Sequence, residues 1–148
     1  MSLKNQIKSD MKDAMRSSDK ERLSVIRMLL ASVQKREIEE RRELDDAELL
    51  AVIEKQVKQH KDSAKQFSDA GRAERAEAEL AEAAMLTAYL PEPLSDAELD
   101  AMIDAVINET GAASMKDMGK VMAAIKAQAQ GRADMGALSG KIKARLAG

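Results

Sequence analysis

Hydrophobic side chains recur along the chain with the spacing of an α-helix. Between residues 3 and 14 they stand three or four positions apart, so that they share one helical face. The segment 23–33 is apolar almost all round, which is typical of a helix enclosed by its neighbours, and we expect it at the centre of an N-terminal bundle. The segment 49–67 carries another apolar stripe, and an alanine-rich helix follows up to residue 90. The pattern therefore predicts four consecutive helices.

Two nearly identical helix starts divide the chain. Segments 44–49 and 94–99 each combine an N-cap residue, a glutamate three positions later and a pair of leucines that can clamp the first turn. A Pro-Glu-Pro sequence at 91–93 breaks the helix between them, because neither proline can continue it. We therefore predict an all-α protein, with an N-terminal bundle of about four helices over residues 1–90 and a C-terminal three-helix module over residues 94–148.

The C-terminal module contains three helical stripes. The first covers residues 99–107 and ends at Gly111, which suits a left-handed C-terminal position. Ser114 is a suitable N-cap for the second helix and Asp134 for the third, with a turn at Gly131 between them. The apolar positions expected to face the core of the last two helices are Met115, Met118, Met122 and Ile125, followed by Leu138, Ile142 and Leu146.

Charge is unevenly distributed over this module, although the whole chain has a formal net charge of −2. Residues 91–114 hold six acids and no base, whereas bases dominate the remainder. If the apolar stripes pack together, the basic side chains stay outside and can converge on one surface that contacts RNA phosphates. The alternative is that they only balance the acidic helix. The residues predicted to bind RNA are Lys116, Lys120, Arg132, Lys141 and Arg145.

The amino-acid composition argues against several classes of structure and function. The chain has one Tyr, one Phe, no Trp and no Cys, which disfavours strands and excludes disulfides and thiolate metal sites. The scarcity of aromatic rings also argues against stacking on single-stranded bases. No secretory or membrane-spanning apolar run is visible, so we expect a soluble cytoplasmic protein without a membrane partner.

Several other residues resemble parts of metal or phosphate sites, but their neighbours in the sequence do not favour such a function. His60 is the only histidine and has apolar neighbours, so we expect a packed, hydrogen-bonded ring and not a metal ligand. The segment 131–136 has the glycine spacing of a phosphate loop but lacks its Lys and Ser/Thr. Close helix packing is the expected role of Gly136 and Gly140. For Gly119 we also expect a closely packed neighbour, with the backbone of a ligand as the alternative. The lysine row at Lys55, Lys58, Lys61 and Lys65 is expected to be a solvated face.

Five blocks of the sequence, in the right order, carry a family resemblance. They are residues 21–29, 57–63, 89–92, 114–122 and 131–134, and together they make the chain resemble the stand-alone YqeY-like members of the GatB/YqeY family. The resemblance implies an all-helical protein with a larger N-terminal and a smaller C-terminal bundle. It also implies that the C-terminal part is similar to the tail of the GatB subunit of glutamine-dependent tRNA amidotransferase, which contacts tRNA. Ala123–Ala127 depart from the family pattern, which has a Gly and often a Pro there.

Three functional hypotheses follow from the residues and the resemblance. The first is a tRNA-associated accessory module that positions RNA through phosphate contacts. The second, implied by the resemblance alone, is carbon–nitrogen ligase activity with glutamine as amide donor inside a larger assembly. The third is a protein–protein adaptor that uses the methionine-rich face of the C-terminal module. We expect a monomer with tRNA as partner, an amidotransferase or aminoacyl-tRNA synthetase as a further candidate partner, and no catalytic residue, cofactor or metal in the chain itself.

Overall fold

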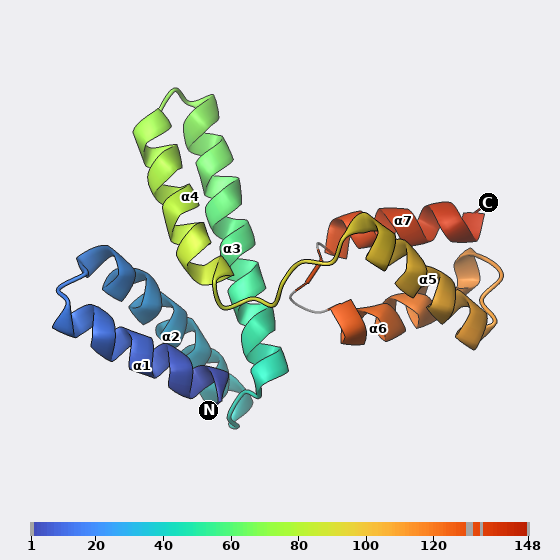
Figure 1. The fold of residues 1–148 in the computed structure, drawn as a ribbon, viewed down its shortest axis with the longest axis horizontal. Helices are drawn as coiled ribbons and strands as arrows, with labels where there is room; N and C mark the ends of the chain where they lie inside the picture. Colours follow the sequence, from blue (N-terminus) through green and yellow to red (C-terminus); the bar gives the residue numbers. More distant parts are fainter. Residues whose placement is uncertain (1, 130–131, 134, 148) are drawn as a thin grey trace. The chain divides into compact units, whose positions relative to one another are not determined.

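The computed structural model describes residues 2–129, 132–133 and 135–147, and the all-α prediction is confirmed over this part of the chain. It holds seven α-helices, one short 3₁₀ turn and no strand (Figure 1). The chain divides into two compact units, Met1–Leu90 (unit 1) and Pro91–Gly148 (unit 2). The elements in chain order are α1 (Leu3–Arg16), α2 (Lys20–Glu40), α3 (Asp46–Asp69), α4 (Ala73–Thr87), α5 (Asp96–Thr110), η1 (Met115–Asp117), α6 (Met118–Ala129) and α7 (Met135–Ala147).

Unit 1 consists of two helical hairpins, α1 with α2 and α3 with α4 (Figure 1). Side-chain caps are present at the starts of α1 and α2. Ser2 Oγ accepts from the Asn5 amide at 3.2 Å, and Asp19 Oδ1 accepts from the Arg22 amide at 3.2 Å. Gly71, at φ +75°, makes the turn between α3 and α4, a conformation that disfavours side chains with a Cβ.

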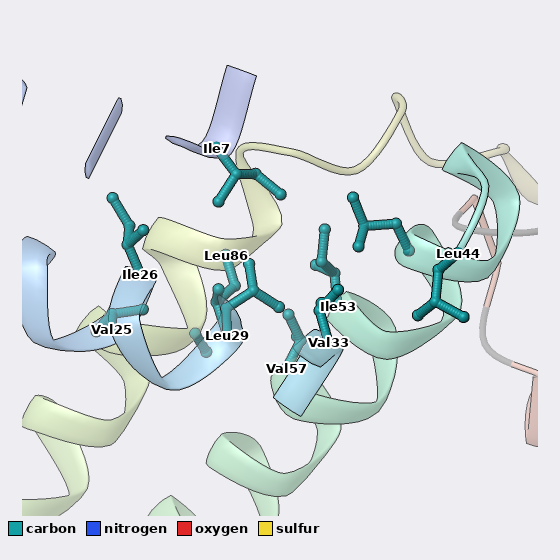
Figure 2. Packing of buried hydrophobic residues seen from close by; sticks show 11 residues of the cluster. Ile7, Val25, Ile26, Leu29, Val33, Leu44, Ile53, Val57 and Leu86 are labelled. Carbon is teal, nitrogen blue, oxygen red and sulfur yellow. The ribbon is translucent and has the colours of Figure 1, made fainter. Parts of the chain in front are cut away.

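The core of unit 1 takes residues from all four helices. Ile7 of α1, Leu29 of α2, Ile53 of α3 and Leu86 of α4 are fully buried (Figure 2). Leu44, in the connection before α3, is buried in the same cluster. Its burial beside the first turn of α3 confirms the predicted leucine pair at that helix start.

The prediction that the segment 23–33 of α2 is enclosed on all sides is wrong. Met28, which lies within this segment, is 58% exposed. The buried positions Ile26, Leu29 and Val33 follow one another at helical spacing and therefore share a single face. Val25 is also buried and Leu30 packs against the core, whereas Met28 lies outside the buried face.

Unit 2 is a small three-helix arrangement of α5, α6 and α7. Its helix start carries the predicted capping box, with the Glu98 amide donating to Ser95 Oγ at 3.1 Å and the Ser95 amide to Glu98 Oε2 at 3.2 Å. Gly111 ends α5 at φ +67°. The core is formed by Leu99, Ile103, Val106, Val121, Ile125, Ala129, Leu138, Ile142 and Leu146, which confirms the predicted stripe of the last helix.

The second helix of unit 2 starts differently from the prediction. A 3₁₀ turn, η1, precedes α6, and Met115 is 43% exposed and not in the core. A 3₁₀ turn has about 3.0 residues per turn against 3.6 in an α-helix, so residues of η1 do not stay in line with the buried face of α6. Ile125 is buried as predicted, and Met118 and Met122 are half-buried and pack against the core, which Val121 and Ala129 complete. The predicted turn at 131 and cap at 134 fall outside the described residues, as does the side chain of residue 135.

Candidate nucleic-acid interface

Two of the predicted RNA-binding residues, Lys141 and Arg145, form ion pairs with the acidic helix α5. Lys141 Nζ lies 3.2 Å from Asp100 Oδ1 and 3.6 Å from Asp96 Oδ1. Arg145 contacts Asp104, and its Nη2 lies 3.9 Å from Asp100 Oδ1. The hydrogen bond to Asp100 is the main reason why the pKa of Lys141 is raised above its ordinary value. These cations balance the acids of α5, as the alternative reading of the charge pattern expected.

The sequence spacing explains this ladder of ion pairs. Residues 96, 100 and 104 stand four apart on α5, and residues 141 and 145 stand four apart on α7. Side chains at this spacing line one edge of a helix. Because α5 and α7 pack through their apolar stripes, the two edges meet.

Arg132 connects two segments of unit 2 through hydrogen bonds. Its Nε donates to the carbonyl oxygen of Glu92 at 2.9 Å, and its own carbonyl accepts from the Leu94 amide at 2.8 Å. The residue is half-buried. Arg132 therefore fastens the segment before α5 to the chain that follows α6.

The other two predicted residues, Lys116 of η1 and Lys120 of α6, are exposed. Neither forms an ion pair with an acid among the described residues of the chain. Asp117, which follows Lys116 in the sequence, accepts hydrogen bonds from the amides of Ala113 at 2.9 Å and Ser114 at 3.4 Å. These two bonds, with a smaller contribution from the charge of Lys120, hold the pKa of Asp117 below its ordinary value.

Gly119 lies between these two lysines, and its expected role in close packing is wrong. A Cβ added at this position would meet no heavy atom within 4 Å, and the same is true of Gly140. Both glycines are exposed. Glycine inside a helix costs about 1 kcal/mol relative to alanine, and no neighbour within unit 2 explains that cost at Gly119. We call Lys116, Gly119 and Lys120 the α6-start surface.

The five predicted residues thus fall into two groups. Lys141 and Arg145 neutralise α5 and Arg132 holds a connecting segment, whereas the α6-start surface carries charge directed to solvent. Sequence reasoning gave the neutralisation of the acidic helix as an alternative but did not identify Asp100 and Asp104 as the individual partners of the last helix. Their four-residue spacing, matching that of the bases, was the available signal.

In unit 1 the lysine row of α3, Lys55, Lys58, Lys61 and Lys65, is exposed, as the prediction of a solvated face required. His60 is held by hydrogen bonding, as predicted, with Nδ1 2.6 Å from Glu79 Oε2 on α4. Its side chain is 13% exposed. No helix among the described residues combines the length and apolar character needed to cross a membrane.

Comparison with known proteins gives the chain its family. The family model described as Yqey-like protein matches residues 4–146. Altered inheritance of mitochondria protein 41, mitochondrial, from Pyrenophora tritici-repentis is 30% identical over 128 residues, which are 83% of this chain and 71% of that protein. The protein of the same name from Lachancea thermotolerans is 33% identical over 106 residues, 70% of this chain and 57% of that protein. Because the family match extends over nearly all of its residues, the chain belongs to the YqeY-like family.

Proposed function

We propose that this protein is a tRNA-associated accessory module that contacts the RNA backbone through the α6-start surface. The observation that carries the proposal is the pair of exposed cations, Lys116 and Lys120, which form no ion pair with an acid of the described residues. The resemblance of this unit to the tail of the GatB subunit suggests tRNA as the nucleic acid. A lysine ammonium gains affinity by releasing counterions from phosphates, and this gain is available only to a cation that is not already paired.

The same reasoning reduces the expected contribution of Lys141 and Arg145. Their charges already interact with Asp100 and Asp104, so a phosphate would have to compete with carboxylates at hydrogen-bond distance. Arg132 would have to give up its bond to the Glu92 carbonyl. We therefore propose that Lys141, Arg145 and Arg132 stabilise unit 2. Direct contact with phosphates is then made by the α6-start surface.

The open backbone at Gly119 fits the same surface. With no Cβ and no neighbour within 4 Å, this part of α6 allows an RNA backbone to approach the helix closely between the two lysines. Gly119→Ala is expected to stabilise α6, because alanine favours a helix, and to weaken RNA binding. Unchanged affinity in this variant would remove the glycine from the interface.

The expected mode of recognition is contact with phosphates and not with base faces. The sequence from 91 to 148 contains no aromatic residue, and the single tyrosine of the chain donates its hydroxyl to Asp10 in unit 1. Aromatic rings are the usual surface on which unpaired bases stack, whereas double-helical RNA is bound through phosphates and 2′-hydroxyls. The helical parts of a folded tRNA provide such backbone.

Crosslinking the protein to RNA in cells, followed by sequencing of the bound RNA, tests the proposal. Enrichment of tRNA with the wild type, and its loss in Lys116→Ala/Lys120→Ala, is the expected result. Recovery of no RNA above background would contradict the proposal. Recovery of an amidotransferase or a synthetase without RNA would favour the adaptor hypothesis instead.

A further inference from the structure

Three potential metal ligands lie between α3 and α4. They belong to unit 1, whereas the proposed RNA surface belongs to unit 2. His60 of α3 faces Glu79 and Glu82 of α4. His60 Nδ1 is 2.6 Å from Glu79 Oε2 and 3.3 Å from Glu82 Oε2. One ligand atom from each of the three residues lies within 4.8 Å of the other two, and all three side chains are partly buried.

Hydrogen bonds among the three side chains cannot give both carboxylates a donor. A ring nitrogen carries at most one proton, so His60 Nδ1 donates one hydrogen bond although two carboxylates converge on it. Neither Glu79 nor Glu82 has an ion pair with a lysine or arginine of the described residues. Two carboxylate groups without a lysine or arginine partner thus converge on one partly buried ring nitrogen, an arrangement whose charge a divalent cation would compensate.

We propose that His60, Glu79 and Glu82 bind a divalent transition-metal ion of the zinc type. One histidine nitrogen and two carboxylate oxygens form a donor set that suits zinc and its neighbours. The proposal departs from the expectation for His60 in the sequence, where no second ligand was visible near it. The signal missed was a pair of glutamates three apart on the next helix.

The distances fit this coordination after a small movement. Zinc bonds to nitrogen and oxygen are about 2.0–2.1 Å long, so two ligand atoms at a tetrahedral angle lie roughly 3.3 Å apart. His60 Nδ1 and Glu82 Oε2 already have this separation. Glu79 Oε2, at 2.6 Å, has to retract by about 0.7 Å, which a glutamate achieves by rotating its side chain.

The remaining coordination position is accessible to water. His60 and Glu79 border an open groove of about 530 Å³ that Asp62 and Ser63 of α3 also line. Three protein ligands with an open fourth position are common in sites where a metal binds water or a substrate group. An ion bound here would also join α3 to α4 and so stabilise the second hairpin of unit 1.

Isothermal titration of the full chain with Zn²⁺ tests the site, with Co²⁺ as a spectroscopic probe. We expect one saturable site per chain, a visible Co²⁺ absorption typical of nitrogen and oxygen ligands, and a higher melting temperature with metal. His60→Ala should abolish saturable binding. Glu82→Gln should weaken it about tenfold or more while leaving the bond between His60 and Glu79 intact.

Glu77→Gln is the matched control. Glu77 is exposed and lies on α4 like Glu82, so this variant loses one negative charge, as Glu82→Gln does, without touching the site. Its metal affinity should equal that of the wild type. If His60→Ala fails to fold, the metal affinity and the Co²⁺ spectrum of Glu82→Gln test the proposal instead. The proposal is overturned by the absence of a one-to-one site, by equal affinity in Glu82→Gln, or by Ca²⁺ binding as tight as Zn²⁺.

Discussion

Replacing Tyr89 with phenylalanine removes a single hydroxyl that connects three helices of unit 1. Tyr89 follows the end of α4, and its hydroxyl donates to Asp10 Oδ2 of α1 at 2.5 Å. Arg22 Nη2 of α2 lies 3.7 Å from the same oxygen. The phenylalanine keeps the ring and its packing, so the experiment isolates the hydrogen bond.

The structure sets the size of the expected effect. A hydrogen bond to a charged group contributes about 1.5–3 kcal/mol when it is shielded from water. Tyr89 is half-buried and the Asp10 side chain is 22% exposed, so the lower part of that range applies. Asp10 keeps Arg22 beside it in the variant and is not left alone. We expect Tyr89→Phe to lower the free energy of unfolding of unit 1 by about 1–2 kcal/mol.

Thermal and urea unfolding, followed by circular dichroism at 222 nm, measure this loss. For a unit of this size the midpoint temperature should fall by roughly 5–10 °C. A double-mutant cycle with Asp10→Ala should give a coupling energy above about 0.5 kcal/mol. A Tyr89→Phe protein that unfolds like the wild type, or a cycle without coupling, would refute the assignment.

The pH dependence supplies a second test of the same bond. Burial, and then the hydrogen bond to Asp10, raises the pKa of Tyr89 above its ordinary value. Because the folded pKa lies above the unfolded one, the stabilisation is complete below about pH 10 and is lost as the pH rises beyond it. The stability difference between wild type and Tyr89→Phe should therefore shrink above pH 10. A constant difference across this range would contradict the reasoning.

Two further predictions concern unit 1. Leu86→Ala should lower the free energy of unfolding of the unit by about 2–5 kcal/mol, since Leu86 is fully buried. Leu80→Ala on the same helix should change the stability little, because Leu80 is 51% exposed. Tyr89 fluorescence during urea unfolding measures the stability of both variants. The bidentate bond from Arg42, at 2.6 and 2.7 Å, lowers the pKa of Glu48 from 4.5 to about 2. Because the folded pKa is depressed, this stabilisation is present above pH 4.5 and disappears as the pH falls toward 2, so Glu48→Gln should lose less stability than the wild type over that window. Equal acid sensitivity of the two proteins in a pH titration of the urea midpoint would contradict this role of Glu48.

Helix starts and apolar stripes were the features that the sequence predicted best. Local hydrogen bonds at Asp45 and Ser95 depend only on residues three positions away, so they are readable from the chain alone. The exposure of Met28 and Met115 was not predictable in the same way. Whether a side chain at a helical position meets a neighbour depends on which face another helix covers, and a 3₁₀ turn shifts that face.

The candidate sites show the same limit more strongly. The sequence indicated the basic residues of unit 2, but not that Lys141 reaches Asp100, a partner 41 residues away. It equally did not show that Glu79 and Glu82 converge on His60. Such pairs are set by the packing of helices against one another, and a single sequence contains no direct signal for them.

The comparison of two charge-matched variants tests the proposed function most directly. Lys116→Ala/Lys120→Ala removes the two cations of the α6-start surface. Lys61→Ala/Lys65→Ala removes two exposed lysines, also four residues apart, from α3. Both variants change the net charge equally, so a general electrostatic effect on RNA would be the same in each.

The measurement is the equilibrium affinity for tRNA as a function of salt concentration. We expect Lys116→Ala/Lys120→Ala to weaken binding and to flatten the log–log salt dependence by about 1.4–1.8 units, the contribution of two phosphate contacts. Lys61→Ala/Lys65→Ala should leave the slope close to that of the wild type. Equal slopes for the wild type and Lys116→Ala/Lys120→Ala, with helicity intact, or an equal loss in both variants, would contradict the account.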